Sequence, residues 1–131
     1  MSLPVPSHDE ILFLMESGFI QRDAKRLQAA RETFEGVRVL CPQSEMPDIA
    51  LGTVSFAEGN IDEAITRYQA ALAKNPSSAF AHAQMGEACL FKKDQDTARQ
   101  YLEKAVELDP RGEAGNLARS LLDLAKAAKV E

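Results

Sequence analysis

The side chains that most often carry out chemistry are sparse in this sequence of 131 residues. There are two histidines, His8 and His82, and neither stands at a recognisable spacing from the nucleophile or orienting acid that a general base needs. Acidic residues lie close together at Asp62-Glu63 and at Asp94 and Asp96, but they begin expected helices, where negative charge complements the helix dipole. No glycine-rich phosphate loop or EF-hand spacing occurs. We therefore predict a protein that is not an enzyme and needs no cofactor.

The two cysteines, Cys41 and Cys89, do not indicate a metal site. They form no C-x-x-C pair, and no histidine or second cysteine stands beside either of them to complete a set of ligands. In a reducing compartment such isolated thiols behave as small apolar residues. We expect both to be free and buried.

Charge and hydropathy exclude two further classes of protein. With 15 basic and 20 acidic residues the net charge is -5, which makes nucleic acid a poor partner. The only dense apolar run is 11–15, far shorter than the roughly 20 residues that a membrane-spanning helix needs. Asp9 and Glu10 stand where a secretory signal would carry basic residues. We expect a cytoplasmic protein that is not inserted into a membrane.

The elements that must position any binding surface come from an internal repeat of 34 residues. When 11–44, 45–78 and 79–112 are aligned without gaps, residues of one type or one character fall into the same columns. These columns are Gly18, Gly52 and Gly86; Ala30, Ala64 and Ala98; Phe34, Tyr68 and Leu102; Val37, Ala71 and Ala105; and Pro42, Pro76 and Pro110.

The columns predict a helical hairpin in each unit, for example helices over 45–58 and 61–75 joined by a turn at Gly59-Asn60. Small residues let the two backbones approach closely, and each proline ends a second helix because the residue before it is pushed out of the helical region. Ser7 with Glu10 matches a capping box, and Ser44 and Ser78 precede the first helices of the second and third units.

This pattern resembles the tetratricopeptide repeat (TPR) family over residues 11–112. The resemblance implies an all-α fold of three TPR helix-turn-helix repeats, 11–44, 45–78 and 79–112, in a right-handed superhelix. An N-terminal arm and helix start (1–10) precede them, and 113–131 is predicted to be a C-terminal capping helix because its apolar residues follow a helical stripe. The sequence departs from the family in the first helices. Its frequent Trp is here Leu14, Asp48 and His82, and its frequent Tyr is Gln21, Ser55 and Cys89.

In this family the first helix of each repeat lines a concave groove, and its groove-facing offsets carry over to twelve positions. They are Leu12, Met15, Phe19 and Arg22 in repeat one; Met46, Ile49, Thr53 and Phe56 in repeat two; and Phe80, Ala83, Glu87 and Leu90 in repeat three. Eight of the twelve are Leu, Met, Ile or Phe, so a carboxylate clamp, which needs fixed cationic donors, is disfavoured. An apolar lining suits a hydrophobic or amphipathic helical segment. Because apolar helical stripes are usually core, the alternative that several of these residues are simply buried stays open.

The resemblance therefore implies a non-catalytic protein-protein interaction module that binds a protein or peptide with an apolar or amphipathic segment. A more specific alternative is a cytosolic chaperone of a bacterial type III secretion substrate, a needle or translocator subunit, because 34–36, 51–52 and 60–65 look similar to that group. A scaffold subunit of a cytosolic complex is a third reading.

Self-association is also expected, through the first repeat. Phe13 and Ile20 occupy offsets that pack against a preceding repeat in this family, and here no preceding repeat exists. Either the arm carrying Leu3 and Val5 covers them, or a second copy does. We predict a homodimer through the N-terminal repeat.

Overall fold

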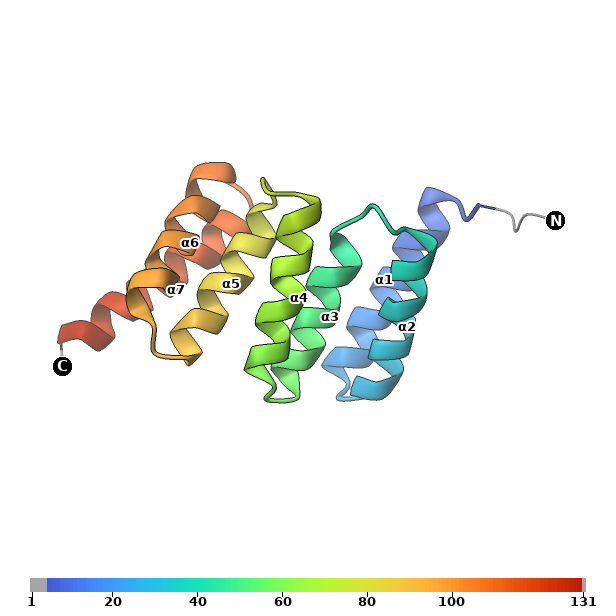
Figure 1. Cartoon of the computed structure of the whole chain (residues 1–131), viewed down its shortest axis with the longest axis horizontal. Coiled ribbons are helices and arrows are strands. Elements are labelled where there is room, and N and C mark those ends of the chain that lie inside the picture. Colours follow the sequence, from blue (N-terminus) through green and yellow to red (C-terminus); the bar gives the residue numbers. More distant parts are fainter. Residues whose placement is uncertain (1–4, 131) are drawn as a thin grey trace.

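The computed structural model describes residues 5–130, which form seven α-helices and no strand. The helices follow one another along an elongated array (Figure 1). Their bounds are α1 (His8–Asp23), α2 (Leu27–Leu40), α3 (Met46–Ala57), α4 (Ile61–Lys74), α5 (Ala79–Phe91), α6 (Gln95–Leu108) and α7 (Glu113–Val130). The all-helical fold class predicted from the 34-residue period is confirmed, and within residues 5–130 no helix is both long and apolar enough to cross a membrane.

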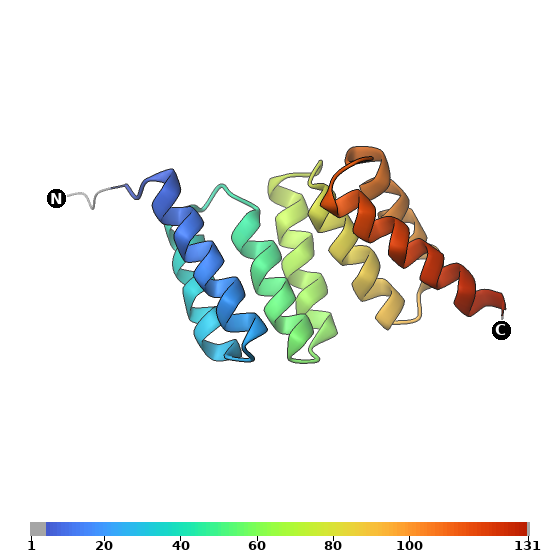
Figure 2. The same ribbon diagram turned by 180° about the vertical axis from the view of Figure 1, so that it is seen from behind.

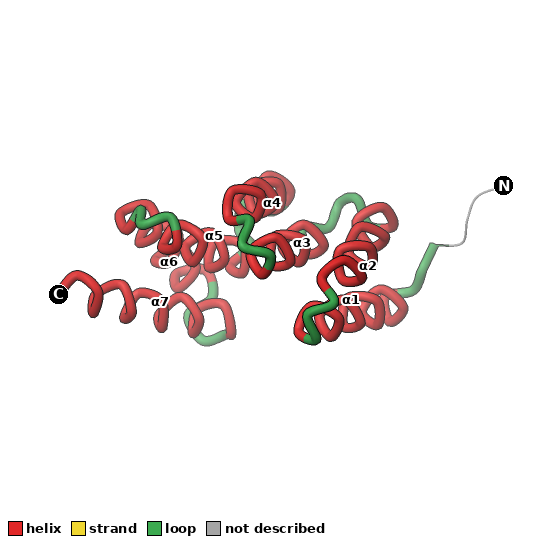
Figure 3. The backbone as a smooth tube through the Cα atoms, turned by 90° about the horizontal axis from the view of Figure 1, so that it is seen from below, coloured by secondary structure: helices red, strands yellow, loops and turns green. Residues whose placement is uncertain are grey.

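Successive helices pack as hairpins, with α2, α4 and α6 on the side seen in Figure 1 and α1 and α7 on the side seen in Figure 2. Viewed along the helices, α4 lies on one side of the array and α1 and α7 lie on the other (Figure 3). The expected helix ends are confirmed: α2, α4 and α6 each end two residues before a proline of the repeated column. The capping box at the start of α1 is present, with the Ser7 Oγ accepting the Glu10 N–H at 3.1 Å.

The glycine column explains why the two helices of each hairpin pack so closely. A Cβ atom added at any of these glycines would overlap the large buried side chain opposite, in the pairs Gly18 with Phe34, Gly52 with Tyr68, and Gly86 with Leu102. Each of these three large side chains is fully buried. The glycine and aromatic-or-leucine columns are therefore two halves of one contact, repeated three times.

The turn inside each hairpin contains a residue in the left-handed region. Lys25, Gly59 and Lys93 have φ values of 66°, 82° and 64°, and they stand 34 residues apart. Only the middle repeat places glycine there, although glycine adopts this conformation at the lowest cost. The two lysines therefore hold a backbone conformation that L-residues disfavour.

Two departures from the family pattern have structural explanations. Asp48 is buried in α3 and pairs with Lys74 of α4, whose Nζ lies 2.6 Å from its Oδ2. His82 Nε2 lies 2.9 Å from the Pro76 carbonyl oxygen, so this histidine fastens α5 to the preceding loop. Both side chains act within the framework, where the family more often has Trp.

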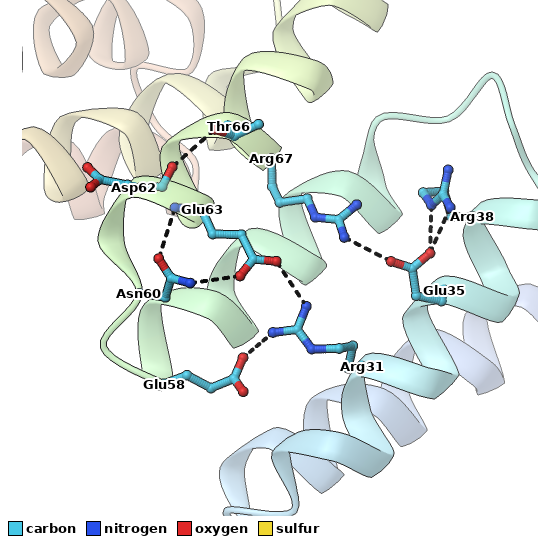
Figure 4. A network of polar contacts seen from close by, with 9 residues as sticks. All are labelled: Arg31, Glu35, Arg38, Glu58, Asn60, Asp62, Glu63, Thr66 and Arg67. Atoms are coloured by element: carbon cyan, nitrogen blue, oxygen red, sulfur yellow. Dashed lines mark hydrogen bonds and ion pairs between the residues drawn. The ribbon is translucent and has the colours of Figure 1, made fainter.

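A network of ion pairs links α2 to α4 on the side away from α1 (Figure 4). Arg67 Nη2 lies 3.0 Å from Glu35 Oε1, and Arg31 reaches both Glu58 and Glu63. Because these side chains are at least partly exposed, each pair contributes at most about 1 kcal/mol. The network helps to fix the register of neighbouring hairpins, in addition to the apolar packing beneath it.

The last helix covers part of the third repeat. Asp109 caps it, because its Oδ2 accepts the Ala114 N–H at 3.2 Å. Ala118 of α7 lies in one buried cluster with Ala83 of α5, together with Leu102 and Ala105 of α6. No described residue covers the first helix in this way: Phe13 and Ile20 are 68% and 69% exposed.

Candidate functional site: a groove along α1, α3 and α5

The groove consists of two adjoining hollows. The first, which we call the apolar hollow, has a volume of about 530 Å³ and lies between α1, the end of α2 and the start of α3. Its lining residues are Pro6, His8, Ile11, Leu12, Met15, Glu16, Phe19, Val37, Cys41, Ser44, Met46 and Pro47.

Large apolar side chains form the walls of the apolar hollow. Leu12 and Met46 are 45% and 38% exposed, whereas Met15 is buried and belongs to the core beneath them. Phe19 is held by the core, since its ring lies 5.0 Å from that of Phe34. The apolar hollow therefore has a base of packed core side chains and two walls of partly exposed apolar side chains.

The second, or polar, hollow has a volume of about 500 Å³ and lies between the C-terminal part of α1, α3 and α5. Its lining residues are Arg22, Asp23, Lys25, Thr53, Phe56, Ala57, Tyr68, Gln84 and Glu87. The two hollows are neighbours, because Arg22, which lines the polar one, lies 5.0 Å from the centre of the Phe19 ring, which lines the apolar one.

Of the two cations that line the polar hollow, Arg22 and Lys25, Arg22 is already engaged. Arg22 Nη1 donates to Thr53 Oγ1 at 2.9 Å, and Arg22 Nη2 lies 2.9 Å from Asp23 Oδ1. Thr53 Oγ1 in turn donates to the Ala50 carbonyl oxygen at 2.7 Å. Arg22 is therefore fixed against α3 and paired with its neighbouring acid.

The negative charge is not engaged in this way. Burial raises the pKa of Glu87 above its ordinary value, and no hydrogen bond from a described residue opposes that effect. Tyr68 is fully buried, and its hydroxyl has no hydrogen-bond partner within residues 5–130. Burial, followed by the charge of Glu87, raises the pKa of the Tyr68 phenol, while Arg22 acts in the opposite direction. The Tyr68 phenol thus lies close enough to Glu87 and Arg22 for both charges to affect its pKa.

The residues expected to line the groove fall into three groups. Seven of the eleven non-cationic positions lie at the hollows: Leu12, Met15, Phe19 and Met46 at the apolar one, and Thr53, Phe56 and Glu87 at the polar one. Ile49 and Ala83 are buried in core clusters. Neither of these two side chains lines either hollow.

The other two positions lie in the third repeat. Phe80 is 37% exposed but lines neither hollow. Leu90 packs against the cluster that α7 completes, and it lines a separate small hollow with Phe91 and Leu124. The final helix therefore removes much of the third repeat from the groove.

Sequence reasoning missed several lining residues. Cys41 was expected to be buried, yet it is half-buried and lines the apolar hollow, whereas Cys89 is buried as predicted. Tyr68 belongs to the aromatic column, whose position in the repeat indicates packing only, yet it also lines the polar hollow. Gln84 stands three residues before Glu87, a helical spacing that could have placed the two on one face.

The described part of the chain places no three His, Cys, Asp or Glu side chains where they could hold a metal ion together. What the groove offers is contact area for apolar side chains at one end and unpaired hydrogen-bonding groups at the other.

Comparison with known proteins supports the repeat assignment. The sequence model of the tetratricopeptide repeat family matches residues 49–113, and no curated protein matches the sequence. Among solved structures, the type III secretion chaperone SycD from Yersinia enterocolitica, in complex with a peptide of the translocator YopD, is similar. It is 24% identical with a TM-score of 0.76, over 94% of this chain and 97% of that one.

Two further structures share the fold. PcrH from Pseudomonas aeruginosa is 21% identical with a TM-score of 0.78 over 95% of both chains, and PcrH is also known in complex with the chaperone binding regions of PopB and PopD. The first TPR of Spaghetti (RPAP3), bound to an HSP90 peptide, is 18% identical with a TM-score of 0.77 over 97% of this chain and 98% of that one. At these identities the likeness shows the fold. Together with the three glycine contacts, it shows that the described chain has the tetratricopeptide repeat fold, and residues 49–113 match the sequence model of that family.

Proposed function

We propose that the protein is an interaction module that binds an apolar or amphipathic segment of another protein in the groove along α1, α3 and α5. The observation that carries this proposal is the apolar hollow, where partly exposed Leu12 and Met46 face a space of about 530 Å³ over a packed floor. A hollow of this size accommodates several side chains. Each large apolar side chain that moves from water into it contributes about 1.5–3 kcal/mol.

A chaperone of a type III secretion substrate is the more specific candidate. SycD and PcrH, which have this fold, are seen in complex with segments of translocators. The apolar lining favours this role over a carboxylate clamp, which needs fixed cationic donors. Arg22, the one cation among the expected groove positions, is already paired with Asp23. Under this proposal the protein acts in the cytoplasm and holds a needle or translocator subunit in a soluble form. A scaffold role would use the same groove in a permanent complex.

The test compares charged substitutions inside and outside the groove. Tagged wild type, Leu12→Glu, Met46→Glu and the control Val39→Glu are expressed in the native host, and bound proteins are identified. Val39 is 72% exposed on α2 and lines neither hollow, so it controls for adding a charge at an exposed apolar site.

We expect one partner to co-purify with wild type and Val39→Glu and to be lost from both groove variants at unchanged helical content. A partner that is a secreted subunit supports the chaperone, and a stable cytosolic assembly supports the scaffold. Equal recovery with all four proteins would contradict binding in the groove.

A further inference from the structure

The polar hollow contains groups that apolar binding does not use. Tyr68 is fully buried, yet its hydroxyl lacks a hydrogen-bond partner among residues 5–130, and leaving such a group unpaired is costly. Glu87 is half-buried beside it, and no described cationic side chain lies against its carboxylate. Both line one space of about 500 Å³ that lies next to the apolar hollow.

The charges around this space favour a cation. Arg22 is compensated by Asp23 and held by Thr53, so it is not free to receive an anion. Lys25 lies at the rim and is exposed, where water and salt screen its charge, whereas the charge of Glu87 is partly shielded from water. The net charge of the whole chain, -5, acts in the same direction.

We propose that the polar hollow is a subsite for a basic side chain, Lys or Arg, of the segment that binds in the apolar hollow. This inference rests on the proposed function. The ammonium or guanidinium group would donate hydrogen bonds to the Glu87 carboxylate and to the Tyr68 hydroxyl oxygen, which then gains the partner it lacks. An acidic side chain would instead meet the Glu87 carboxylate and an Arg22 that is already paired.

The helix geometry sets the spacing in the partner. Met15 and Arg22, which mark the two hollows on α1, are seven residues apart, about 10 Å along the helix axis. A helical partner covers about 10 Å with seven residues, and an extended one covers it with about three. The basic residue is therefore expected about seven or about three positions from the apolar anchor, according to the conformation of the bound segment.

The probes are two series of fluorescein-labelled peptides of 18 residues, one an amphipathic Leu/Ala helix and one kept extended by spaced prolines. In each series a single position is Lys, Met or Glu, and this position is moved along the peptide. Fluorescence anisotropy measures the dissociation constant with the full-length protein. Met serves as the uncharged control because it has a similar length.

We expect one position at which Lys binds about tenfold more tightly than Met, the size of a hydrogen-bonded charge contact. Glu87→Gln should abolish this preference without changing the affinity for the Met peptide. Glu103→Gln, which removes an exposed acid of α6 that lines neither part of the groove, should retain the preference. Tyr68→Phe should reduce it severalfold, while its thermal stability equals or exceeds that of wild type because the unpaired hydroxyl is gone.

Three results would overturn the subsite. Lys and Met peptides could bind equally at every position, the Lys preference could survive Glu87→Gln, or Glu peptides could bind best, which would make the hollow an anion site. In each case Met peptides still bind and the proposed function stands. If no peptide in either series binds, the proposed function fails and the subsite fails with it.

Discussion

Two glycines in helices of this protein should respond in opposite ways to the same substitution. Gly36 lies in α2, where an added Cβ would meet nothing within 4 Å beyond its chain neighbours and the backbone of its own helix, whereas an added Cβ at Gly52 in α3 would overlap the ring of Tyr68. Alanine favours a helix over glycine by about 1 kcal/mol at both positions. We therefore expect Gly36→Ala to stabilise the protein by about 0.5–1 kcal/mol.

At Gly52 the intrinsic gain is outweighed by overpacking. The added Cβ would lie 2.6 Å from Tyr68 Cδ1, well inside van der Waals contact, and the fully buried ring is packed in a core cluster of α3, α4 and α5 residues that it would have to disturb in order to shift. Overpacking typically costs about 1–3 kcal/mol, so after the helix gain Gly52→Ala should destabilise by up to about 2 kcal/mol. Gly52→Val, with a larger and branched side chain, should be more severe.

Urea denaturation followed by circular dichroism measures both changes. A double-mutant cycle adds specificity, because combining Gly52→Ala with Tyr68→Ala removes the overlapping ring and should show a favourable coupling of about 1 kcal/mol or more. If Gly52→Ala and Gly36→Ala shifted the free energy of unfolding in the same direction, the contact between the glycine and aromatic columns would not be what determines the packing of the hairpins.

Three further predictions concern the turns, the ion pairs and the uncovered end of the array. Lys25→Gly should stabilise by about 1 kcal/mol in urea denaturation, because Lys25 has a φ of 66°, and Lys25→Ala should not. Partial burial tends to raise the pKa of Glu35, but the guanidinium of Arg38 holds that pKa below its ordinary value of 4.5. Its contribution to stability is therefore present at neutral pH and lost as the pH falls through the lowered pKa, so Glu35→Gln should lose less stability than wild type between pH 7 and pH 3. Phe13 and Ile20 are largely exposed, so light scattering should show a wild-type dimer that becomes a monomer when both are made polar. A wild-type monomer at high concentration would exclude the dimer.

The exposure of Phe13 and Ile20 bears on whether the N-terminal arm covers them, which was the alternative to a dimer. Leu3 lies outside the described residues, and Val5 is 90% exposed, so Val5 does not cover Phe13 or Ile20. Within residues 5–130 nothing covers the end of the array, as the dimer prediction requires.

Features that repeat at a fixed interval could be predicted from the sequence. Each hairpin reuses the same local contacts, so glycine facing an aromatic residue or leucine, and a proline after the second helix, appear as columns. The left-handed turn also repeats, but glycine signals it only at Gly59, because the other two repeats have lysine there. A column of aligned repeats reveals a shared backbone conformation only where the residue type, such as glycine, is characteristic of that conformation.

The groove was harder to predict because its surroundings are not periodic. Ile49 and Ala83 have the same helical offset as Met15, yet they are core residues without access to either hollow. Ala83 is covered because α7 packs against only the third repeat. The polar hollow combines residues of α1, α3, α4 and α5, and no local spacing in the sequence connects Arg22, Tyr68 and Glu87.

Photo-cross-linking in the native host tests the central claim, binding of a partner segment in the groove, most directly. p-Benzoylphenylalanine is introduced separately at Leu12, at Met46 and at Val39, which lies on α2 outside both hollows. The account predicts that one protein cross-links from Leu12 and from Met46, through an apolar or amphipathic segment, and not from Val39. Cross-linking of the co-purifying partner from Val39, with none from the two groove positions, would contradict it.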